Sequence, residues 1–157
     1  MIQKIVGRFF GFEQRIEELK QQVEQLSWDT AFGMWTRGAF VQFCQVMPRG
    51  FRVIAFIDLD GIHKLNEKHG YTEVDRRVKV AFAISLRRSD VVARWFSGDE
   101  IVILFDSDRP GAERKIVELE KSARKEGLSF KYEIGAWEVG HQPVEDVIEE
   151  LANKIAK

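Results

Sequence analysis

The chain has 157 residues, with 24 Lys and Arg against 25 Asp and Glu for a formal charge of −1, and 45% of its residues are hydrophobic. A chain of this length can form one globular domain that buries roughly 70% of its unfolded surface. Its composition excludes the disordered, collagen-like and disulfide-stapled classes of protein. The balanced charge differs from that of proteins whose main partner is nucleic acid or an anionic membrane, and we expect neither partner.

Cys44 is the only cysteine, so no disulfide can form within the chain. Its apolar neighbours, among them Phe40 and Phe43, favour an inert core thiol over a nucleophile. No stretch approaches the ~20 apolar residues of a membrane span, and the first ten residues lack the apolar core of a signal peptide. We therefore expect a cytoplasmic protein.

Residues 1–28 are expected to form an N-terminal helical stalk. Apolar residues recur here in alternating steps of four and three, the heptad spacing of a coiled coil. These residues are Phe12, Ile16, Leu19, Val23 and Leu26. Two repeats are short for a coiled coil, and the alternative is an amphipathic helix that lies on its own domain. The pattern favours a homodimer that pairs through this helix.

Residues 29–157 are expected to form one α/β domain. After an irregular stretch from Trp28 to Gly33, the predicted elements are a helix over 36–47, a strand over 53–57, helices over 62–69 and 74–86, a hairpin of strands 91–96 and 101–105, a helix over 110–127, an extended segment over 128–138 and a last helix over 143–157. No internal repeat or low-complexity tract is present.

Acidic residues occur at two places where the predicted sheet ends. The strand over 53–57 has the continuous β-branched and aromatic composition of a strand covered on both faces, and Asp58 and Asp60 follow it directly. The hairpin turns at Asp99 and Glu100. If the two strands are antiparallel neighbours, these carboxylates share one rim, where their repulsion must be offset by protons or by a hard cation such as Mg²⁺ or Mn²⁺. The alternative is a set of solvated turn residues.

Four short motifs occur in an order known from one protein family. They are DTAFGMWTRGAF (29–40), DLDGIHKLNEKHGY (58–71), SGDEI (97–101) and YEIG (132–135). They resemble the motifs of GGDEF domains, which are diguanylate cyclases and their degenerate relatives. The resemblance covers nearly everything from Asp29 to the C-terminus, with a divergent S-G-D-E-I signature.

The resemblance implies a palm-like α/β (α+β) fold, in which helices flank a central, mostly antiparallel sheet. It implies a nucleotidyltransferase that works as a homodimer with Mg²⁺ or Mn²⁺ as cofactor. Two domains loaded with GTP would face each other and join their substrates into cyclic di-GMP (c-di-GMP) with release of pyrophosphate.

The resemblance also implies roles for individual residues. The implied metal ligands are Asp58, the Leu59 carbonyl and Asp99, and the implied catalytic residues are Glu100 and Asp99. The implied substrate-binding residues are Gly61, Ile62 and His63 for the phosphates, Asn66 and Asp75 for the guanine edge, and Gly98 for close approach of the backbone. A helix N-terminus suits phosphate, and an Asp accepts from donor groups that guanine has and adenine lacks. The alternative for the base-reading pair is a surface asparagine and a helix cap.

Arg87 and Asp90 have the Arg-x-x-Asp spacing of the family's product-inhibition site, for which the alternative is a helix end rich in arginine. The pattern also departs from the family at Ser97, at His63 and in one extra residue before the signature, which predicts a bulge or a displaced hairpin. These departures leave two further readings open. One is a degenerate module that binds GTP or c-di-GMP as a sensor or interaction domain. The other is a palm-type cyclase that makes a different cyclic nucleotide.

Overall fold

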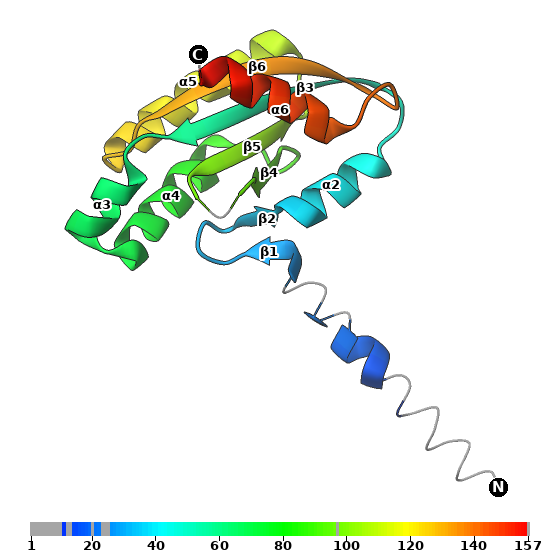
Figure 1. The fold of residues 1–157 in the computed structure, drawn as a ribbon, viewed down its shortest axis with the longest axis horizontal. Helices are drawn as coiled ribbons and strands as arrows, with labels where there is room; N and C mark the ends of the chain where they lie inside the picture. The colour runs from blue at the N-terminus through cyan, green and yellow to red at the C-terminus, as the bar shows by residue number, and fades with distance from the viewer. Residues whose placement is uncertain (1–10, 12–13, 20, 23–25, 97, 157) are drawn as a thin grey trace, which may run out of the picture.

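The computed structural model describes residues 11, 14–19, 21–22, 26–96 and 98–156, which contain a six-stranded sheet of order β1-β2-β4-β5-β3-β6 (Figure 1). The strands are β1 (Trp28–Asp29), β2 (Met34–Thr36), β3 (Gly50–Leu59), β4 (Val91–Arg94), β5 (Glu100–Phe105) and β6 (Phe130–Val139). Neighbouring strands are antiparallel except β2 and β4, which are parallel. The mostly antiparallel sheet that the sequence predicted is confirmed.

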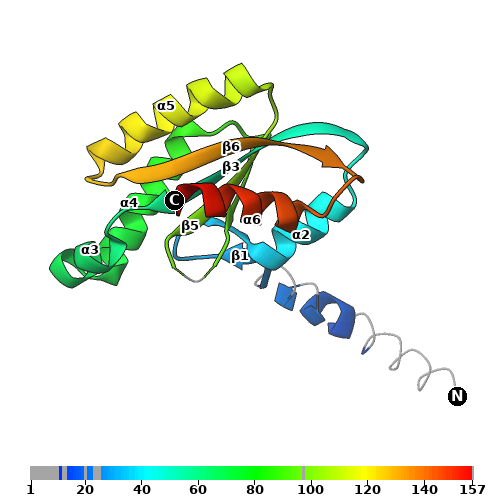
Figure 2. The same cartoon turned by 45° about the horizontal axis from the view of Figure 1, so that its top comes forward.

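Helices cover both faces of this sheet (Figure 2). They are α2 (Arg37–Gln45), α3 (Ile62–His69), α4 (Tyr71–Ser85), α5 (Arg109–Lys125) and α6 (Val144–Ile155). The α4 and α5 helices pack on one face, where Ile62 and Leu65 of α3 join them, and α2 and α6 pack on the other. The expected α/β architecture with flanking helices is therefore present.

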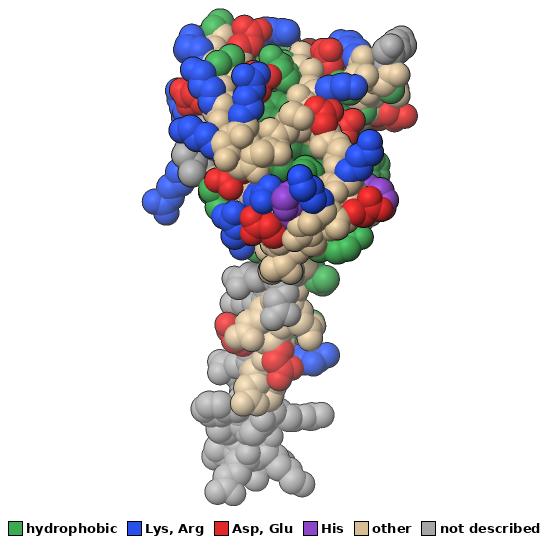
Figure 3. Space-filling model, turned by 90° about the vertical axis from the view of Figure 1, so that its left-hand side faces the viewer, with side chains coloured by type: hydrophobic (Ala, Val, Ile, Leu, Met, Phe, Trp, Pro, Cys, Tyr) green, Lys and Arg blue, Asp and Glu red, His purple; other side chains and the backbone are tan. Residues whose placement is uncertain are grey.

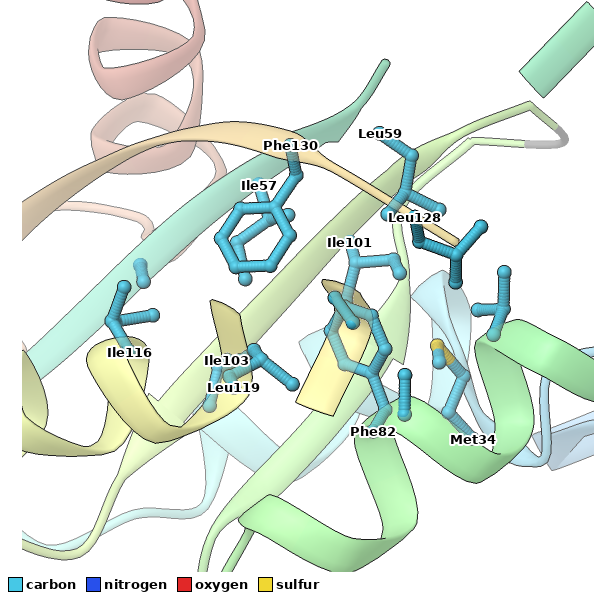
Figure 4. Packing of buried hydrophobic residues seen from close by; sticks show 14 of the residues in the cluster. Met34, Ile57, Leu59, Phe82, Ile101, Ile103, Ile116, Leu119, Leu128 and Phe130 are labelled. Atoms are coloured by element: carbon cyan, nitrogen blue, oxygen red, sulfur yellow. The ribbon is translucent and has the colours of Figure 1, made fainter. Parts of the chain in front are cut away.

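The central strand β3 is covered on both sides because alternate side chains enter different clusters. Ile57 and Leu59 belong to the cluster under α4 and α5, whereas Ile54 and Phe56 belong to the cluster under α2 and α6. Figure 4 shows the first cluster, where Ile57 and Ile101 of the sheet lie among side chains such as Phe82 of α4 and Leu119 of α5. This double burial explains the continuous apolar run that predicted the strand.

Local signals set most helix boundaries. Thr36 caps α2 by accepting a hydrogen bond from the Ala39 amide at 3.4 Å, and Asp108 caps α5 by accepting one from the Gly111 amide at 2.8 Å. Helix α4 begins at Tyr71 rather than at the predicted residue 74. Gly70, at φ 82°, ends α3, and α4 starts at the following residue. The stretch from Trp28 to Gly33, expected to be irregular, contains the short strand β1, and β2 follows it directly at Met34–Thr36.

The N-terminal helix projects from the sheet. Residues 14–19 are helical and lie apart from the domain in both ribbon views (Figures 1 and 2). Ile16, Leu19 and Leu26 of the heptad pattern are 38%, 46% and 76% exposed. Phe12 and Val23, also part of that pattern, lie outside the described residues. Within the described part of the chain, no helix is both long enough and apolar enough to cross a membrane.

Candidate functional site

The carboxyl end of β3 and the β4–β5 hairpin meet at one rim of the sheet. The register of β3 with β5 pairs Asp58 with Glu100, and the Leu59 amide donates to the Asp99 carbonyl at 3.0 Å. The antiparallel neighbourhood that the sequence argument required is therefore present. We call Asp58, Asp60, Asp99 and Glu100 the acidic rim.

The carboxylates of the acidic rim disfavour one another's charge. Burial raises the pKa of Asp58 above its usual range, Asp99 and Asp60 raise it further, and Lys131 lowers it. Burial also raises the pKa of Glu100, and Asp99 and Asp58 add to that effect. Figure 3 shows the end of the molecule where α3 lies, on which Lys and Arg side chains alternate with Asp and Glu. The repulsion among these carboxylates therefore comes from the acidic rim itself and does not reflect a uniformly acidic surface.

The donor set at the rim fits a hard divalent cation. Asp58 and Asp99 offer carboxylate oxygens and Leu59 offers a backbone carbonyl, the ligand types that Mg²⁺ and Mn²⁺ prefer. A cation there would also relieve the repulsion that raises the Asp58 and Glu100 pKa values. Among the described residues, no group of three or more His, Cys, Asp or Glu side chains is arranged to hold a metal ion. The implied set combines two such side chains with a main-chain oxygen.

The turn from β3 into α3 presents an open helix N-terminus. Gly61 adopts the left-handed conformation, with φ 62° and ψ 25°, and apart from its two chain neighbours no described residue has an atom within 4 Å of the position that a Cβ would take. The amides of the first turn, including those of Ile62 and His63, have no intrahelical acceptors because they begin the helix, and no described side chain caps them. A phosphate oxygen is a suitable acceptor for such amides.

Asn66 carries a polar atom that no described residue satisfies. Its Oδ1 is buried and has no hydrogen-bond partner among the residues that the structure describes. Buried amide oxygens are rarely left unpaired in native proteins, and such an atom is often completed by water or a ligand. Asp75, half-buried on α4, lies on the helix that follows α3 after Gly70. The two implied base-reading residues thus stand on consecutive, contacting helices.

Arg94 anchors the tip of the hairpin. Its Nε and Nη2 donate to the Gly98 carbonyl at 3.2 and 3.0 Å, while Nη1 donates to Asp29 Oδ2 at 3.0 Å. The other oxygen of Asp29 accepts from the Phe32 amide at 2.9 Å. The arginine fork therefore ties Gly98 to the β1–β2 segment. No local pattern in the sequence indicates this role, because Asp29 lies 65 residues before Arg94.

The extra residue before the signature does not distort the strands. Residues 91–94 pair regularly with β5, and the Trp95 amide donates to the Glu100 carbonyl at 2.8 Å. The expected bulge is absent from this described ladder. Ser97 falls outside the described residues.

An aromatic cluster beside the loop was also missed by the sequence analysis. The Arg37 guanidinium lies 4.6 Å from the ring centre of Trp95 and 4.7 Å from that of Phe96. Phe96 is 51% exposed. Cation–π contacts between α2 and the hairpin have no local sequence pattern, which is why only a structure reveals this cluster.

The candidate inhibitory residues lie at the opposite end of the sheet from the acidic rim, where β4 begins and β5 ends. Both Asp90 carboxylate oxygens accept backbone hydrogen bonds, from the Arg87 amide and the Asp106 amide, each at 2.9 Å. Asp90 therefore fastens the α4–β4 loop to the end of β5. Arg87 and Arg88 are exposed and line a cavity of 300 Å³ together with residues that include Trp28 and Lys79.

Comparison with known proteins identifies the fold. No protein-family model matches the sequence, and no curated protein matches it. Among solved structures, the coiled coil and GGDEF domain of DgcB from Caulobacter crescentus, in complex with c-di-GMP, is 13% identical with a TM-score of 0.73, over 97% of this chain and 92% of that one.

Two proteins from Pseudomonas aeruginosa are also similar. The diguanylate cyclase SiaD, in complex with its activator SiaC, is 19% identical with a TM-score of 0.66, over 99% of this chain and 66% of that one. The FimX GGDEF domain is 18% identical with a TM-score of 0.67, over 81% of this chain and 90% of that one. At these identities the likeness establishes architecture, and the chain has the fold of the GGDEF domains.

Proposed function

We propose that this protein is a diguanylate cyclase, which condenses two GTP into c-di-GMP with release of two pyrophosphates as a metal-dependent homodimer. The observation that carries the proposal is the pairing of β3 with β5, because it gathers Asp58, Asp99 and Glu100 beside the open N-terminus of α3. The solved complexes of c-di-GMP with domains of this fold support the same ligand chemistry.

The proposed roles follow the geometry of the rim. A cation held by Asp58, Asp99 and the Leu59 carbonyl would supply charge stabilisation when bound. The first amides of α3, from Gly61 to His63, would bind phosphate oxygens, and Gly98 would let the backbone approach the substrate.

Asn66 and Asp75 would bind the guanine edge, and the unpaired Asn66 oxygen would then gain a donor. The 3′-oxygen of one GTP attacks the α-phosphorus of the other, so a P–O bond forms as pyrophosphate leaves. Glu100, whose pKa is raised by burial, is suited to accept the hydroxyl proton. The ring closes when the two nucleotides exchange roles and the second 3′-oxygen attacks the other α-phosphorus, which releases the second pyrophosphate.

Two half-sites must face each other in this reaction, and the helix over residues 14–19 would bring them together. Its exposed Ile16 and Leu19 would be covered by a second copy. We include Arg87 and Asp90 as the site of inhibition by c-di-GMP. Because Asp90 is engaged by two backbone amides, Arg87 would supply the main contact to the product.

The decisive experiment is a product assay on the whole chain. Purified protein is incubated with Mg²⁺ and each of the four ribonucleoside triphosphates, separately and together, and products are identified by liquid chromatography and mass spectrometry. We expect c-di-GMP from GTP alone. A different cyclic nucleotide would keep the mechanism and contradict the assigned base specificity, whereas binding of GTP without any product would contradict cyclase activity.

The second candidate function is a degenerate module that binds GTP or c-di-GMP without turnover. The observation that favours it is the position of Phe96, just before the signature, which is held against Arg37 rather than at the rim. Calorimetric titration with both nucleotides separates the two candidates, since the module should bind at least one of them while the product assay remains negative.

A further inference from the structure

A basic residue completes the row of charged side chains at the acidic rim. Asp58 pairs with Glu100 on β5 and, on its other side, with Lys131 on β6. Residues directly opposite each other in antiparallel strands project their side chains to the same face of the sheet. Glu100, Asp58 and Lys131 therefore form a row across three strands, with the single positive charge at the outer edge.

Lys131 is available to bind a ligand. It is exposed, and it forms no salt bridge with any residue that the structure describes. Its charge nevertheless reaches the rim, because it opposes the rise in the pKa of Asp58 that burial and the neighbouring carboxylates cause. The Lys131 ammonium group thus interacts electrostatically with the acidic rim while it remains free of any salt bridge to a described residue.

The backbone holds Lys131 beside the turn that would bind phosphate. The Asp60 amide donates to the Ser129 carbonyl at 2.9 Å, and the Ser129 hydroxyl donates to Asp60 Oδ2 at 3.0 Å. These bonds fasten the start of β6 to the residue before Gly61. Lys131, on this same stretch of β6, therefore flanks the segment that leads from Asp58 to the N-terminus of α3.

We propose that Lys131 is a substrate-binding residue that contacts the phosphates of the nucleoside triphosphate bound at the acidic rim. The inference rests on the proposed function and names a contact that none of the four sequence motifs assigns. A triphosphate approaching four carboxylates needs positive charge in addition to a cation, and lysine supplies it as a point charge on a long, flexible stem.

This role predicts opposite effects on two ligands when the charge is removed. The Lys131→Gln substitution should weaken GTP binding, because a phosphate contact is lost. The same substitution should strengthen binding of a divalent cation alone, because the rim becomes more negative. A side chain that only supported the fold would weaken both.

The experiment measures binding to the whole chain by isothermal titration with GTP in the presence of Mg²⁺, with guanosine, and with Mn²⁺ alone. For Lys131→Gln we expect about a tenfold loss in GTP affinity, unchanged guanosine affinity and about a threefold gain in Mn²⁺ affinity. Lys131→Arg should keep GTP affinity within about threefold, since it keeps the charge. Lys121→Gln removes an exposed lysine of α5 and serves as the matched control.

The outcomes separate this inference from the proposed function. Unchanged GTP affinity in Lys131→Gln, in a protein that still makes c-di-GMP, overturns the Lys131 assignment alone. Equal losses for GTP and guanosine, or weaker Mn²⁺ binding, overturn it in favour of a structural role. GTP binding without product, but with the expected charge effects, supports Lys131 and contradicts the cyclase. A wild-type chain that binds no GTP contradicts both.

Discussion

The two segments that build the acidic rim are held in place by different means. The turn over 58–61 is fixed by backbone bonds and one left-handed glycine, and the Ser129 hydroxyl adds a bond to Asp60. The hairpin tip is fixed by two arginine side chains, because Arg94 of β4 donates to the Gly98 carbonyl and Arg37 of α2 stacks on Phe96. The first segment is therefore held mainly through the backbone, whereas the second depends on two arginine side chains.

The largest expected effect tests the shared chemistry of the two segments. Asp99→Ala removes a carboxylate from the loop and should lower product formation about a thousandfold, which corresponds to about 4 kcal/mol of transition-state stabilisation. The fold should persist, because the half-buried Asp99 side chain is at a loop tip. Turnover by chromatographic assay and folding by circular dichroism check this. Asp106→Ala removes an exposed acid at the far end of β5 and is the control, and retained turnover in Asp99→Ala contradicts the assignment.

The next effect tests the dependence of the hairpin tip on the Arg94 side chain. Arg94→Ala should lower the free energy of unfolding by about 2–3 kcal/mol, because it leaves the partly buried Asp29 and the Gly98 carbonyl without their donor. Denaturant unfolding measures it. Arg109→Ala breaks an exposed pair with Glu113 and should cost less than about 0.5 kcal/mol. Equal losses in the two variants would mean that the Arg94 fork is no more than a surface pair.

A smaller effect concerns the pH dependence of the first segment. The raised pKa values of Asp58 and Glu100 mean that the folded state binds protons more tightly than the unfolded state, so the stability of the metal-free protein falls as the pH rises through these values. The Asp58→Asn substitution removes the contribution of Asp58 to this loss of stability at higher pH. In EDTA at neutral pH the variant should melt at a higher temperature than the wild type, with the difference vanishing in acid.

Scanning calorimetry over a pH series, with and without Mg²⁺, measures this effect. Added Mg²⁺ should stabilise the wild type more than Asp58→Asn, because the variant has lost a ligand. A variant that is less stable than the wild type at neutral pH in EDTA would show that the Asp58 carboxylate is satisfied without a cation.

The smallest effect concerns the exposed ring in the loop. Phe96→Ala removes one of the two rings against Arg37 and should cost about 0.5–1 kcal/mol. Activity should change less than about threefold, because Phe96 does not belong to the acidic rim. Denaturant unfolding and the product assay measure the two quantities. A large loss of activity would instead place Phe96 in contact with the substrate.

Much of the fold follows from local patterns. The double-sided apolar run predicted β3, and the positions of Pro110, Gly127 and Pro143 predicted the boundaries of α5 and the start of α6. The strands β1 and β2 were not predictable in this way, because they are two and three residues long and depend on pairing with each other and with β4. Short strands carry too few residues for a period to emerge.

The site divides in the same manner. The carboxylates of the rim were predictable, because acids directly after a buried strand and at a hairpin turn are conspicuous. Their meeting depended on one condition, that β3 and β5 are antiparallel neighbours, which the structure meets. The roles of Arg94, Arg37 and Asp90 were not, since each joins segments that are distant in the chain. Side chains of this kind are chosen by the tertiary structure rather than by any repeating pattern.

Cys44 makes the natural sequence a convenient background for site-directed labelling. It is the only cysteine in the chain, it is 2% exposed, and burial, followed by the nearby Glu145, raises the pKa of its thiol to about 12. Maleimide reagents at neutral pH should therefore not react with Cys44. A cysteine introduced at exposed Leu19 would be the one reactive thiol, so spin labels or cross-linkers could be attached to the projecting helix without first removing a native residue.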